Sequence, residues 1–423
     1  MQQSMVGVVP QSPSTEAEIT ATLRDLLATT KQPRIVASGN GAIPWELVRL
    51  IDATLPTYRL NILNAFPGLP WREGVVHETS FVGAGMRKSP GLAYVPARLS
   101  LVPRLFRRAL FPDVVLLHTS APVNGKVSMG IEVNVLPGAV EACKHRGGLV
   151  IAQVNPRMPY TFGDGEISVE DLDAMIHVDS PVAMPARTDA PVDEVAQQIG
   201  EYCANRISSG ATLQMGIGAV PDATLPRLTK LRGLGIWSEM FSDGLLTLQS
   251  SGALDPDRYV VASFAMGSEE LLQWMHMNPQ LRMVRTEVTN DPPRISRQPL
   301  MTSINTALQV DLFDQANASR INARIHSGFG GQTDFVVGAV HARGGQSMMA
   351  LKSWHPKANV STIVPLIDEP VTSFQHTAVI TENGIAELYG RSEKEQAAAL
   401  IENAAHPKVR DELWEEAAEL GLA

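Results

Sequence analysis

Several features that would assign the chain to a class of protein are scarce or missing. Its 423 residues include only two cysteines, Cys143 and Cys203, which are too few for a disulfide framework and wrongly spaced for a zinc site. We therefore expect a reducing compartment, the cytoplasm. The first ten residues lack the basic stretch and apolar run of a signal peptide. No apolar run reaches the roughly 18 residues that span a membrane.

Basic residues are also fewer than acidic residues. The chain has 35 Lys and Arg against 44 Asp and Glu, a net charge of −9. Nucleic acids and anionic membranes both require a basic surface, so neither is an expected partner. The composition is 44% hydrophobic and 19% charged, which is typical of a globular protein. The length allows two or three domains with large cores.

Motifs for metals and dinucleotides are missing as well. The ten histidines include no H-E-x-x-H. No G-x-G-x-x-G is followed by an acidic residue about 20 positions on, and there is no G-x-x-x-x-G-K-[ST] loop. A nucleotide-dependent dehydrogenase is therefore disfavoured, and we expect no metal, nicotinamide or flavin.

The pattern of apolar residues predicts an α/β fold with mostly parallel sheets. Three β-branched runs are apolar without period-two alternation, as expected of strands covered on both faces: residues 34–38, 114–118 and 149–154. Helical patterns lie between them, including residues 15–30 and 139–146. Near the end, residues 394–420 form a charged amphipathic helical region, which is typical of a packed, solvated face.

A composition change predicts two domains. Residues 180–191 are rich in Pro, Ala and Asp and are the best linker in the chain. A helical pattern over residues 192–208 and a strand pattern over 211–215 then begin a second α/β unit. We predict an N-terminal domain of residues 1–188 and a C-terminal domain of residues 189–423.

Glycine turns follow several predicted strands. They lie at residues 39–41, 83–85, 216–218 and 328–331. Glycine lets main-chain N–H groups approach a ligand oxygen closely. Any one of these turns is more often a tight turn and nothing more, so only their combination with other residues carries information.

The stretch around Glu239 provides that combination. Residues 235–237 have the pattern of a buried strand end, and Glu239 follows among small and polar residues. The glycine turns at 216–218 and 328–331 bracket it in sequence, and Asn305 ends another predicted strand. Main-chain N–H groups and an amide suit an oxyanion hole.

Two interpretations of Glu239 stay open on these residues alone. It either caps the next helix or attacks an acyl group. A glutamate at its ordinary pKa of about 4.3 is ionised at neutral pH and needs no activating base. A thioester is the favoured target, because a thiolate leaves readily.

At this point the chain resembles a known family, the acetyl-CoA hydrolase/transferases. These are CoA-transferases that include 4-hydroxybutyrate, butyrate:acetate and succinate:acetate enzymes. The likeness covers nearly the whole sequence, with S-E-M-F-S-D-G around Glu239 among its motifs. The matching segments are residues 81–83 with Arg87, 94–96, 122–130, 151–159, 214–222, 238–244, 290–292, 303–312, 327–335 and 381–388.

The resemblance implies two tandem CoA-transferase-fold domains with the active site between them. It implies a ping-pong mechanism through a glutamyl-CoA thioester at Glu239, with Asn305 orienting the carboxylate. Coenzyme A enters as a substrate, with a short-chain carboxylate, and the protein is a homodimer or homotetramer. The residues that match the substrate site are Gly216, Ile217, Gly218, Gly328, Phe329, Gly330, Gly331 and Gln332.

The sequence departs from the family pattern at four positions. They are Asp314, Gln346, Phe374 and Asn383, where the family commonly has Gly, Lys, Arg and Tyr. These changes leave the proposed chemistry intact but put the CoA phosphate contacts and the acyl group in doubt. Arg87, Lys126 and Arg343 are candidates for phosphate pairing, although each is more readily interpreted as a solvated surface charge.

The main hypothesis is therefore an acyl-CoA:carboxylate CoA-transferase. An acyl-CoA hydrolase is the nearest alternative, because water could intercept the glutamyl thioester with the same residues. A non-catalytic CoA-binding module is the alternative from another class, and the presence of Glu239 argues against it.

Overall fold

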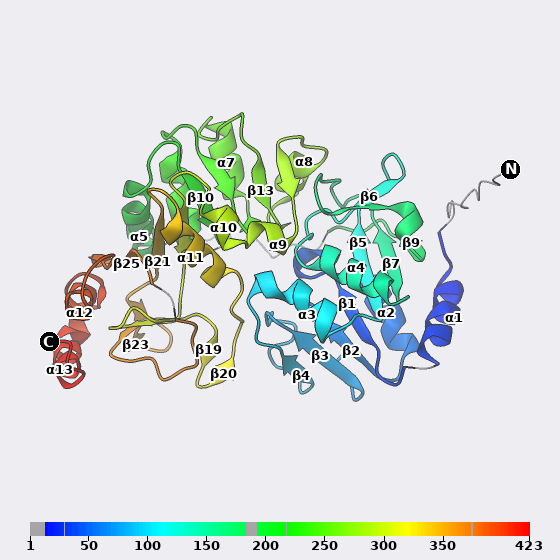
Figure 1. Cartoon of the computed structure of the whole chain (residues 1–423), viewed down its shortest axis with the longest axis horizontal. Helices are drawn as coiled ribbons and strands as arrows, with labels where there is room; N and C mark the ends of the chain where they lie inside the picture. The colour runs from blue at the N-terminus through cyan, green and yellow to red at the C-terminus, as the bar shows by residue number, and fades with distance from the viewer. Residues whose placement is uncertain (1–12, 29, 183–192, 217, 374) are drawn as a thin grey trace.

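Two mostly parallel β-sheets, each flanked by helices, form the framework of the chain. The computed structural model describes residues 13–28, 30–182, 193–216, 218–373 and 375–423. Figure 1 shows two lobes side by side, the first built from the N-terminal half and the second from the C-terminal half. This architecture confirms the α/β class predicted from the sequence.

The first sheet has seven strands in the order β4-β3-β2-β1-β5-β7-β9, and every neighbouring pair is parallel. β5 is buried along its whole length, which explains its apolar run without alternation. The strands are β1 Arg34–Ala37, β2 Tyr58–Asn61, β3 Val75–Thr79, β4 Leu92–Tyr94, β5 Val114–Thr119, β7 Leu149–Val154 and β9 Ala174–His177.

The second sheet has eight strands in the order β15-β13-β11-β10-β16-β21-β25-β26. Only the last pair, β25 and β26, is antiparallel. The strands are β10 Thr212–Met215, β11 Gly235–Trp237, β13 Val260–Ala262, β15 Leu281–Met283, β16 Thr302–Asn305, β21 Gln346–Ala350, β25 Ala378–Thr381 and β26 Gly384–Glu387.

Short strands lie outside these two sheets. They are β6 Lys126–Ser128, β8 Glu166–Ser168, β12 Met240–Phe241, β14 Phe264–Ala265, β17 Gln309–Asp311, β18 Ala316–Asn317, β19 Arg320–Ile321, β20 Arg324–Ile325, β22 Trp354–His355, β23 Val360–Ser361 and β24 Ile363–Val364. The pair β12 and β14 matters for function, because Glu239 immediately precedes β12.

Helices flank both sheets (Figure 1). The first starts at a capping box, in which Thr15 and Glu18 satisfy each other's main-chain N–H groups. The predicted helix at 139–146 begins three residues earlier, with Pro137 in its first turn. The helices are α1 Glu16–Leu27, α2 Trp45–Thr54, α3 Val102–Arg108, α4 Leu136–His145, α5 Glu194–Asn205, α6 Ala219–Thr224, α7 Gly244–Ser250, α8 Glu269–Met275, α9 Thr286–Thr289, α10 Pro292–Ile295, α11 Gln332–His341, α12 Glu393–Ala399 and α13 Arg410–Glu419.

The charged region at 394–420 is helical but not continuous. α12 passes into a π-helical turn at Leu400–Ala404, and α13 starts only at Arg410. Pro407 lies between them and cannot donate to a helix, which accounts for the break. Leu400 and Leu413 are buried in the core of this region, so the helices pack through one face.

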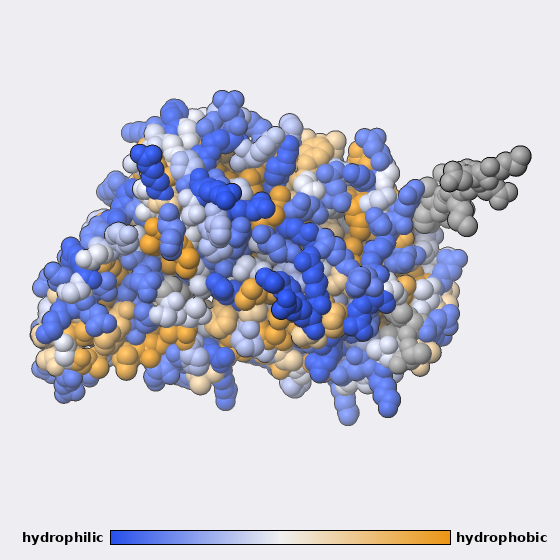
Figure 2. Space-filling model, in the orientation of Figure 1, coloured by the Kyte–Doolittle hydropathy of each residue, from blue (hydrophilic) through white to orange (hydrophobic). Residues whose placement is uncertain are grey.

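The two lobes share one apolar core. Val36 and Val115 of the first sheet belong to the same buried cluster as Leu213 and Ile236 of the second. The predicted boundary at 188/189 falls in residues 183–192, outside the described residues, so the division at that point stays a prediction. Figure 2 shows hydrophilic residues over much of one face of the molecule, with hydrophobic patches among them. Within the described ranges, no helix is both long and apolar enough to cross a bilayer.

Candidate active site

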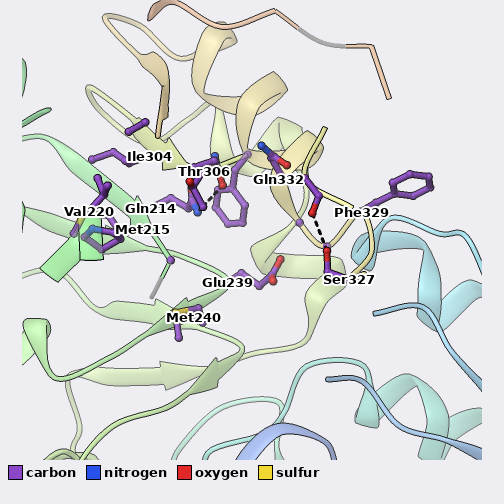
Figure 3. Close-up of a pocket in the computed structure, with 18 of the residues that line it drawn as sticks. Gln214, Met215, Val220, Glu239, Met240, Ile304, Thr306, Ser327, Phe329 and Gln332 are labelled. Atoms are coloured by element: carbon purple, nitrogen blue, oxygen red, sulfur yellow. Dashed lines mark hydrogen bonds between the residues drawn. The ribbon is translucent and has the colours of Figure 1, made fainter. Parts of the chain in front are cut away.

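A cavity lies at the carboxyl ends of four neighbouring parallel strands of the second sheet. Its lining includes Gln214 on β10, Glu239 just after β11, Asn305 on β16 and Ala350 at the end of β21. The carboxyl ends of parallel strands meet at one edge of a sheet, where α/β proteins bind their ligands. The cavity has a volume of about 270 Å³. Figure 3 shows Glu239 between the strand-end residues and the loop that carries Ser327 and Phe329.

The N-terminal lobe closes one side of this cavity. Phe81 lines it beside the loop 327–331 of the C-terminal lobe. Val82 N–H donates to the Ser327 carbonyl at 2.8 Å, and Leu99 N–H donates to the Gly330 carbonyl at 2.9 Å. A side chain at Gly328 would press on the Ser80 carbonyl. The loop is therefore fixed between the two lobes, and the glycine there allows the close approach.

Glu239 is held at both its main chain and its side chain. Its carbonyl accepts hydrogen bonds from Ser263 N–H at 2.9 Å, Ser263 Oγ at 2.8 Å and Phe264 N–H at 3.1 Å. Its Oε2 accepts a hydrogen bond from Asn290 Nδ2 at 2.7 Å. Asn290 is fully buried and is held by Thr289 Oγ1 at 2.7 Å. The carboxyl group therefore has one defined position in the cavity wall.

The N-terminus of α11 lies against the Glu239 carboxyl group. Gly331 is the N-cap of this ten-residue helix, and a Cβ at Gly331 would overlap Glu239 Oε2 and Asn290 Nδ2. Among the described residues, neither Gly330 nor Gly331 donates its main-chain N–H to a protein acceptor. Free N–H groups and the positive end of the helix dipole favour negative charge here. They can stabilise an ionised Glu239 or an oxyanion formed beside it.

Asp334 connects this helix end to the N-terminal lobe. It is buried in the first turn of α11 and accepts hydrogen bonds from Ser100 Oγ at 3.1 Å and Arg98 Nη1 at 3.4 Å. Burial raises the pKa of Asp334 to about 6, and the Ser100 hydrogen bond and the Arg98 charge oppose that rise. The N-terminal lobe thus positions the helix whose N-terminus faces Glu239.

Burial changes the acidity of Glu239. It raises the pKa of Glu239 to about 7, with the Asn290 hydrogen bond opposing the shift and the Asp334 charge adding to it. The sequence-based expectation of an ordinary glutamate pKa is therefore wrong, because the sequence does not show that the carboxyl group is buried between the two lobes. The ionised, nucleophilic form is about half populated near neutral pH.

The amide next to Glu239 is not the one that the sequence indicated. Asn305 lines the cavity but donates to Ser303 Oγ at 2.8 Å and Gln214 Oε1 at 3.4 Å. Asn290 is the residue that contacts the carboxylate. It belongs to the N-D-P motif of the family resemblance, which was the only signal in the sequence that could have found it.

The other predicted site residues fall into three groups. Gly216, Gly328, Phe329, Gly330, Gly331 and Gln332 line the cavity. Gly218, with φ of +122°, caps α6 beside it, and Ile217 lies outside the described residues. Arg343 is exposed beyond the C-terminus of α11, before the amino end of β21, so the structure does not bring it to the cavity. Length explains this: α11 extends about 15 Å from the site.

Arg87, Lys126 and Gln346 lie at different places relative to the cavity, and Phe374 lies outside the described residues. Exposed Arg87 donates to the His326 carbonyl at 2.8 Å, next to the cavity loop, whereas Lys126 lies exposed on β6. Gln346 donates to the Arg206 carbonyl at 2.8 Å. In the described part of the chain, no cluster of three or more His, Cys, Asp or Glu side chains could hold a metal ion.

Asn290 gives a direct test of this geometry. We expect Asn290→Ala to lower kcat about 10- to 100-fold, because a hydrogen bond to a charged group contributes about 1.5–3 kcal/mol. Asn305→Ala should cost less, since Asn305 does not contact Glu239. Steady-state rates of both variants, with thermal unfolding to verify folding, make the comparison. A larger loss in Asn305→Ala would contradict the placement of the two amides.

Comparisons with known proteins agree with the resemblance seen in the sequence. Residues 267–417 match the model of the acetyl-CoA hydrolase/transferase C-terminal domain. The chain is 38% identical over 357 residues to 4-hydroxybutyrate coenzyme A transferase of Clostridium kluyveri, covering 80% of this chain and 81% of the relative. It is also 38% identical over 362 residues to succinyl-CoA:acetate/propanoyl-CoA:succinate CoA transferase of Fasciola hepatica, covering 81% and 74%.

A solved structure extends the similarity over the whole chain. The 4-hydroxybutyrate CoA-transferase of Porphyromonas gingivalis superposes with a TM-score of 0.79 at 29% identity, covering 97% of this chain and 98% of that one. The similarity therefore extends over both sheets.

Proposed function

The chain belongs to the acetyl-CoA hydrolase/transferase family, and on that premise we propose that it is a CoA-transferase that moves CoA from a short-chain acyl-CoA to a carboxylate. The observation that carries the proposal is the position of Glu239: its carboxyl group faces an interdomain cavity, held by Asn290 and the N-terminus of α11. The small volume of the cavity, about 270 Å³, favours a short acyl group.

In the first half of the proposed reaction, the ionised Glu239 attacks the thioester carbonyl. A carbon–oxygen bond forms, the carbon–sulfur bond breaks, and CoA leaves as a thiolate. The product is a mixed anhydride between the acyl group and Glu239. The thiolate then attacks the Glu239 carbonyl carbon and expels the acyl group as a free carboxylate. The enzyme is left with CoA in thioester linkage to Glu239.

The second half repeats these steps in reverse with another acid. The incoming carboxylate attacks the Glu239 thioester and releases the CoA thiolate, which then attacks the acyl carbonyl of the new anhydride. A new acyl-CoA leaves and the Glu239 carboxylate is restored. No net proton is taken up or released, so the site needs no general base. In agreement, none of the described residues that line the cavity is a histidine.

Each neighbour of Glu239 has a role in this scheme. Asn290 orients the carboxylate so that its free oxygen faces the cavity. The N–H groups at Gly330 and Gly331 lie where they can stabilise the oxyanions of both tetrahedral intermediates. Phe81 and Phe335 line the same cavity and exclude water from the anhydride. Exclusion of water favours transfer over hydrolysis.

The choice between transfer and hydrolysis has a direct test. Acetyl-CoA is incubated with the protein and a panel of short carboxylates, and the acyl-CoA products are identified by mass spectrometry. We expect a new acyl-CoA whose formation depends on the added acid. Release of free CoA at the same rate with and without an acceptor would instead support the hydrolase alternative.

The remaining expectations belong to the same proposal. We propose CoA as a substrate with no metal, nicotinamide or flavin, a homodimer or homotetramer, a cytoplasmic location, and two domains that divide near residue 188. Arg87 and Lys126 remain proposed contacts of the CoA phosphates. Arg87 is the better placed of the two, because it contacts the loop that lines the cavity.

A further inference from the structure

A second glutamate is buried at the domain interface beside the proposed nucleophile. Glu132 of the first domain is only 1% exposed. Its Oε2 accepts a hydrogen bond from Asn40 Nδ2 at 2.7 Å, and its Oε1 accepts one from Asn134 Nδ2 at 3.2 Å. Within the described ranges, no Lys, Arg or His forms an ion pair with it. A buried carboxylate without a cation is costly, so the neutral acid is favoured.

The residues around Glu132 form a specialised polar cluster. Asn40, Asn64 and Asn134 all adopt left-handed backbone conformations, with φ of 48°, 46° and 41°. Asn64 Nδ2 donates to Asn40 Oδ1 at 2.7 Å, which orients the Asn40 amide toward Glu132. Such conformations are uncommon outside glycine and gather at functional sites.

The position of this cluster in the first sheet is also typical of a functional site. Asn40 follows β1 and Asn64 follows β2, so both lie at the carboxyl edge of the sheet. β1 is flanked by β2 on one side and β5 on the other, which makes it the point where strand order reverses. Ligand sites of α/β sheets lie at such points.

The segment that carries Glu132 is bonded to the segment that holds Glu239. Asn134 N–H donates to the Ser263 carbonyl at 3.0 Å, and Glu132 forms a β-bridge with Phe264. Ser263 and Phe264 in turn donate their N–H groups to the Glu239 carbonyl. A change of charge at Glu132 therefore affects Glu239 through the few main-chain hydrogen bonds that join these segments. The two carboxyl groups also repel each other directly when both are ionised.

An unused acceptor marks where the proton on Glu132 can be held. Asn134 Oδ1 is buried and has no hydrogen-bond partner among the described residues. A half turn of the Asn134 amide breaks only its bond to Glu132 and brings Oδ1 toward Glu132 Oε1. A protonated Oε1 then donates to Asn134 Oδ1, while Asn40 continues to donate to Oε2. The cluster therefore satisfies the neutral form of Glu132.

We propose that Glu132 is a positioning residue that stays neutral while Glu239 ionises, and that loss of its proton places a second anion beside Glu239 and slows attack on the thioester. This inference rests on the proposed function of Glu239. Burial raises the pKa of Glu132 to about 8, with the Asn40 and Asn134 hydrogen bonds opposing and the Glu239 charge adding to the shift. The proton is therefore lost only on the alkaline side of neutrality.

Two other described titratable groups near the cavity keep their charge state in that range. Asp334 on α11 has a pKa of about 6 and is already charged, with Arg98 beside it. Tyr94 of the first domain has its pKa raised by burial and stays neutral. An alkaline decline in rate near pH 8 is therefore attributed to Glu132.

The test is the pH dependence of the first covalent step in Glu132→Gln. The enzyme–CoA thioester formed from acetyl-CoA in a single turnover is measured by intact-protein mass spectrometry, from about pH 5 to about pH 10. The wild-type rate should decline above about pH 8, and Glu132→Gln should lose that alkaline limb and keep its rate at neutral pH. The exposed Glu201→Gln is the matched control and should behave as wild type. An alkaline limb that persists in Glu132→Gln overturns the proposal.

A measurement without turnover separates this inference from the proposed function. In the folded state Glu132 keeps its proton up to about pH 8, whereas in the unfolded chain it loses the proton above its ordinary pKa of 4.5. This group therefore lowers the stability of the folded state as the pH rises from about 4.5 to about 8. The Tm difference between Glu132→Gln and the wild type should therefore increase in favour of the variant as the pH rises through that range. A Tm difference that does not change with pH contradicts a neutral Glu132. If the wild type forms no thioester at any pH, the proposed function fails, and the Tm comparison still tests the state of Glu132.

A second variant keeps the proposal testable if Glu132→Gln does not fold. Asn40→Gly preserves the left-handed backbone at φ of 48° and removes the hydrogen bond that favours the charged form of Glu132. The alkaline limb should then move to higher pH. An unchanged limb in Asn40→Gly would also overturn the proposal.

Discussion

Glu239→Gln should abolish CoA transfer while the protein stays folded and still binds acyl-CoA. Glutamine has the same shape and can still accept the Asn290 hydrogen bond through its carbonyl oxygen. It has no nucleophilic carboxylate, so neither the anhydride nor the thioester can form. We expect a loss of at least ~10³-fold in kcat, since the residue makes and breaks every covalent bond in the scheme.

The same substitution should increase stability above the ordinary glutamate pKa. The folded-state pKa of Glu239 is about 7 against 4.5 for an ordinary glutamate. The unfolded chain therefore loses this proton first, and the folded state is progressively disfavoured between those two values. Glutamine does not titrate, so Glu239→Gln should gain up to about 3 kcal/mol at neutral pH. Loss of activity together with a higher Tm would show that the buried carboxylate needed for the reaction lowers the stability of the fold.

Chemical trapping identifies the residue directly. Borohydride added with acyl-CoA should reduce the glutamyl thioester, and mass spectrometry of the peptide spanning Trp237 to Asp243 should locate the change at Glu239. The Glu239→Gln variant should remain unmodified, and exposed Glu201→Gln should be trapped like the wild type. An unmodified peptide in the wild type, or most of the activity retained in Glu239→Gln, would remove Glu239 from the mechanism.

Local sequence signals were sufficient for most of the fold. β7 begins and ends at the predicted residues, 149–154, and β11 includes the strand end predicted at 235–237, because a run of buried apolar residues is sufficient to define a parallel strand. α1 lies within the predicted 15–30 because its capping box is visible in the sequence. These features depend only on residues within a few positions of one another.

The site was less predictable because its contacts join distant segments. Asn290 and Asn305 are both asparagines in matched motifs, and nothing local shows which one faces Glu239. The choice depends on the paths of α9 and β16, which bring Asn290 to the carboxylate across 51 residues of sequence. Glu132 lies in the other lobe and gave no signal at all. The raised pKa of Glu239 has the same origin, since the packing of the two lobes produces the burial.

One departure from the family pattern became understandable only in three dimensions. Asp314 stands where the family commonly has glycine, and its φ is +60°, a conformation that glycine adopts freely. The Asp314 carboxylate accepts hydrogen bonds from the His376 ring at 2.6 Å and from the His376 main-chain N–H at 2.7 Å. This buried pair holds the C-terminal segment in place and lies apart from the cavity-lining residues. The departure therefore concerns local structure rather than the chemistry at Glu239.

Gly331→Ala should reduce activity by about 100-fold with little loss of stability. The main chain at Gly331 has φ of −98° and ψ of 0°, which an alanine adopts without strain. The added Cβ, however, would overlap Glu239 Oε2 and Asn290 Nδ2. Both atoms lie at the ends of side chains that can rotate away, so the fold survives and the carboxylate is displaced. A misplacement of about 1 Å at a reacting group can cost about 100-fold in rate.

Gly147→Ala should have the opposite effects, a loss of stability without a loss of activity. Gly147 follows α4 with φ of +73°, is exposed, and has open space around its Cβ position. Alanine in this left-handed conformation should cost about 1 kcal/mol of stability. It should leave kcat unchanged, because the C-terminal end of α4 is not part of the cavity lining.

The two variants together separate positioning of the nucleophile from general destabilisation. Thermal unfolding and steady-state kinetics are measured on both, and the thioester-trapping experiment is repeated on Gly331→Ala. We expect a lower Tm with full activity in Gly147→Ala, and a near-normal Tm with little trapped thioester in Gly331→Ala. Full trapping at the wild-type rate in Gly331→Ala would mean that the contact between the α11 N-terminus and Glu239 does not set the geometry of attack.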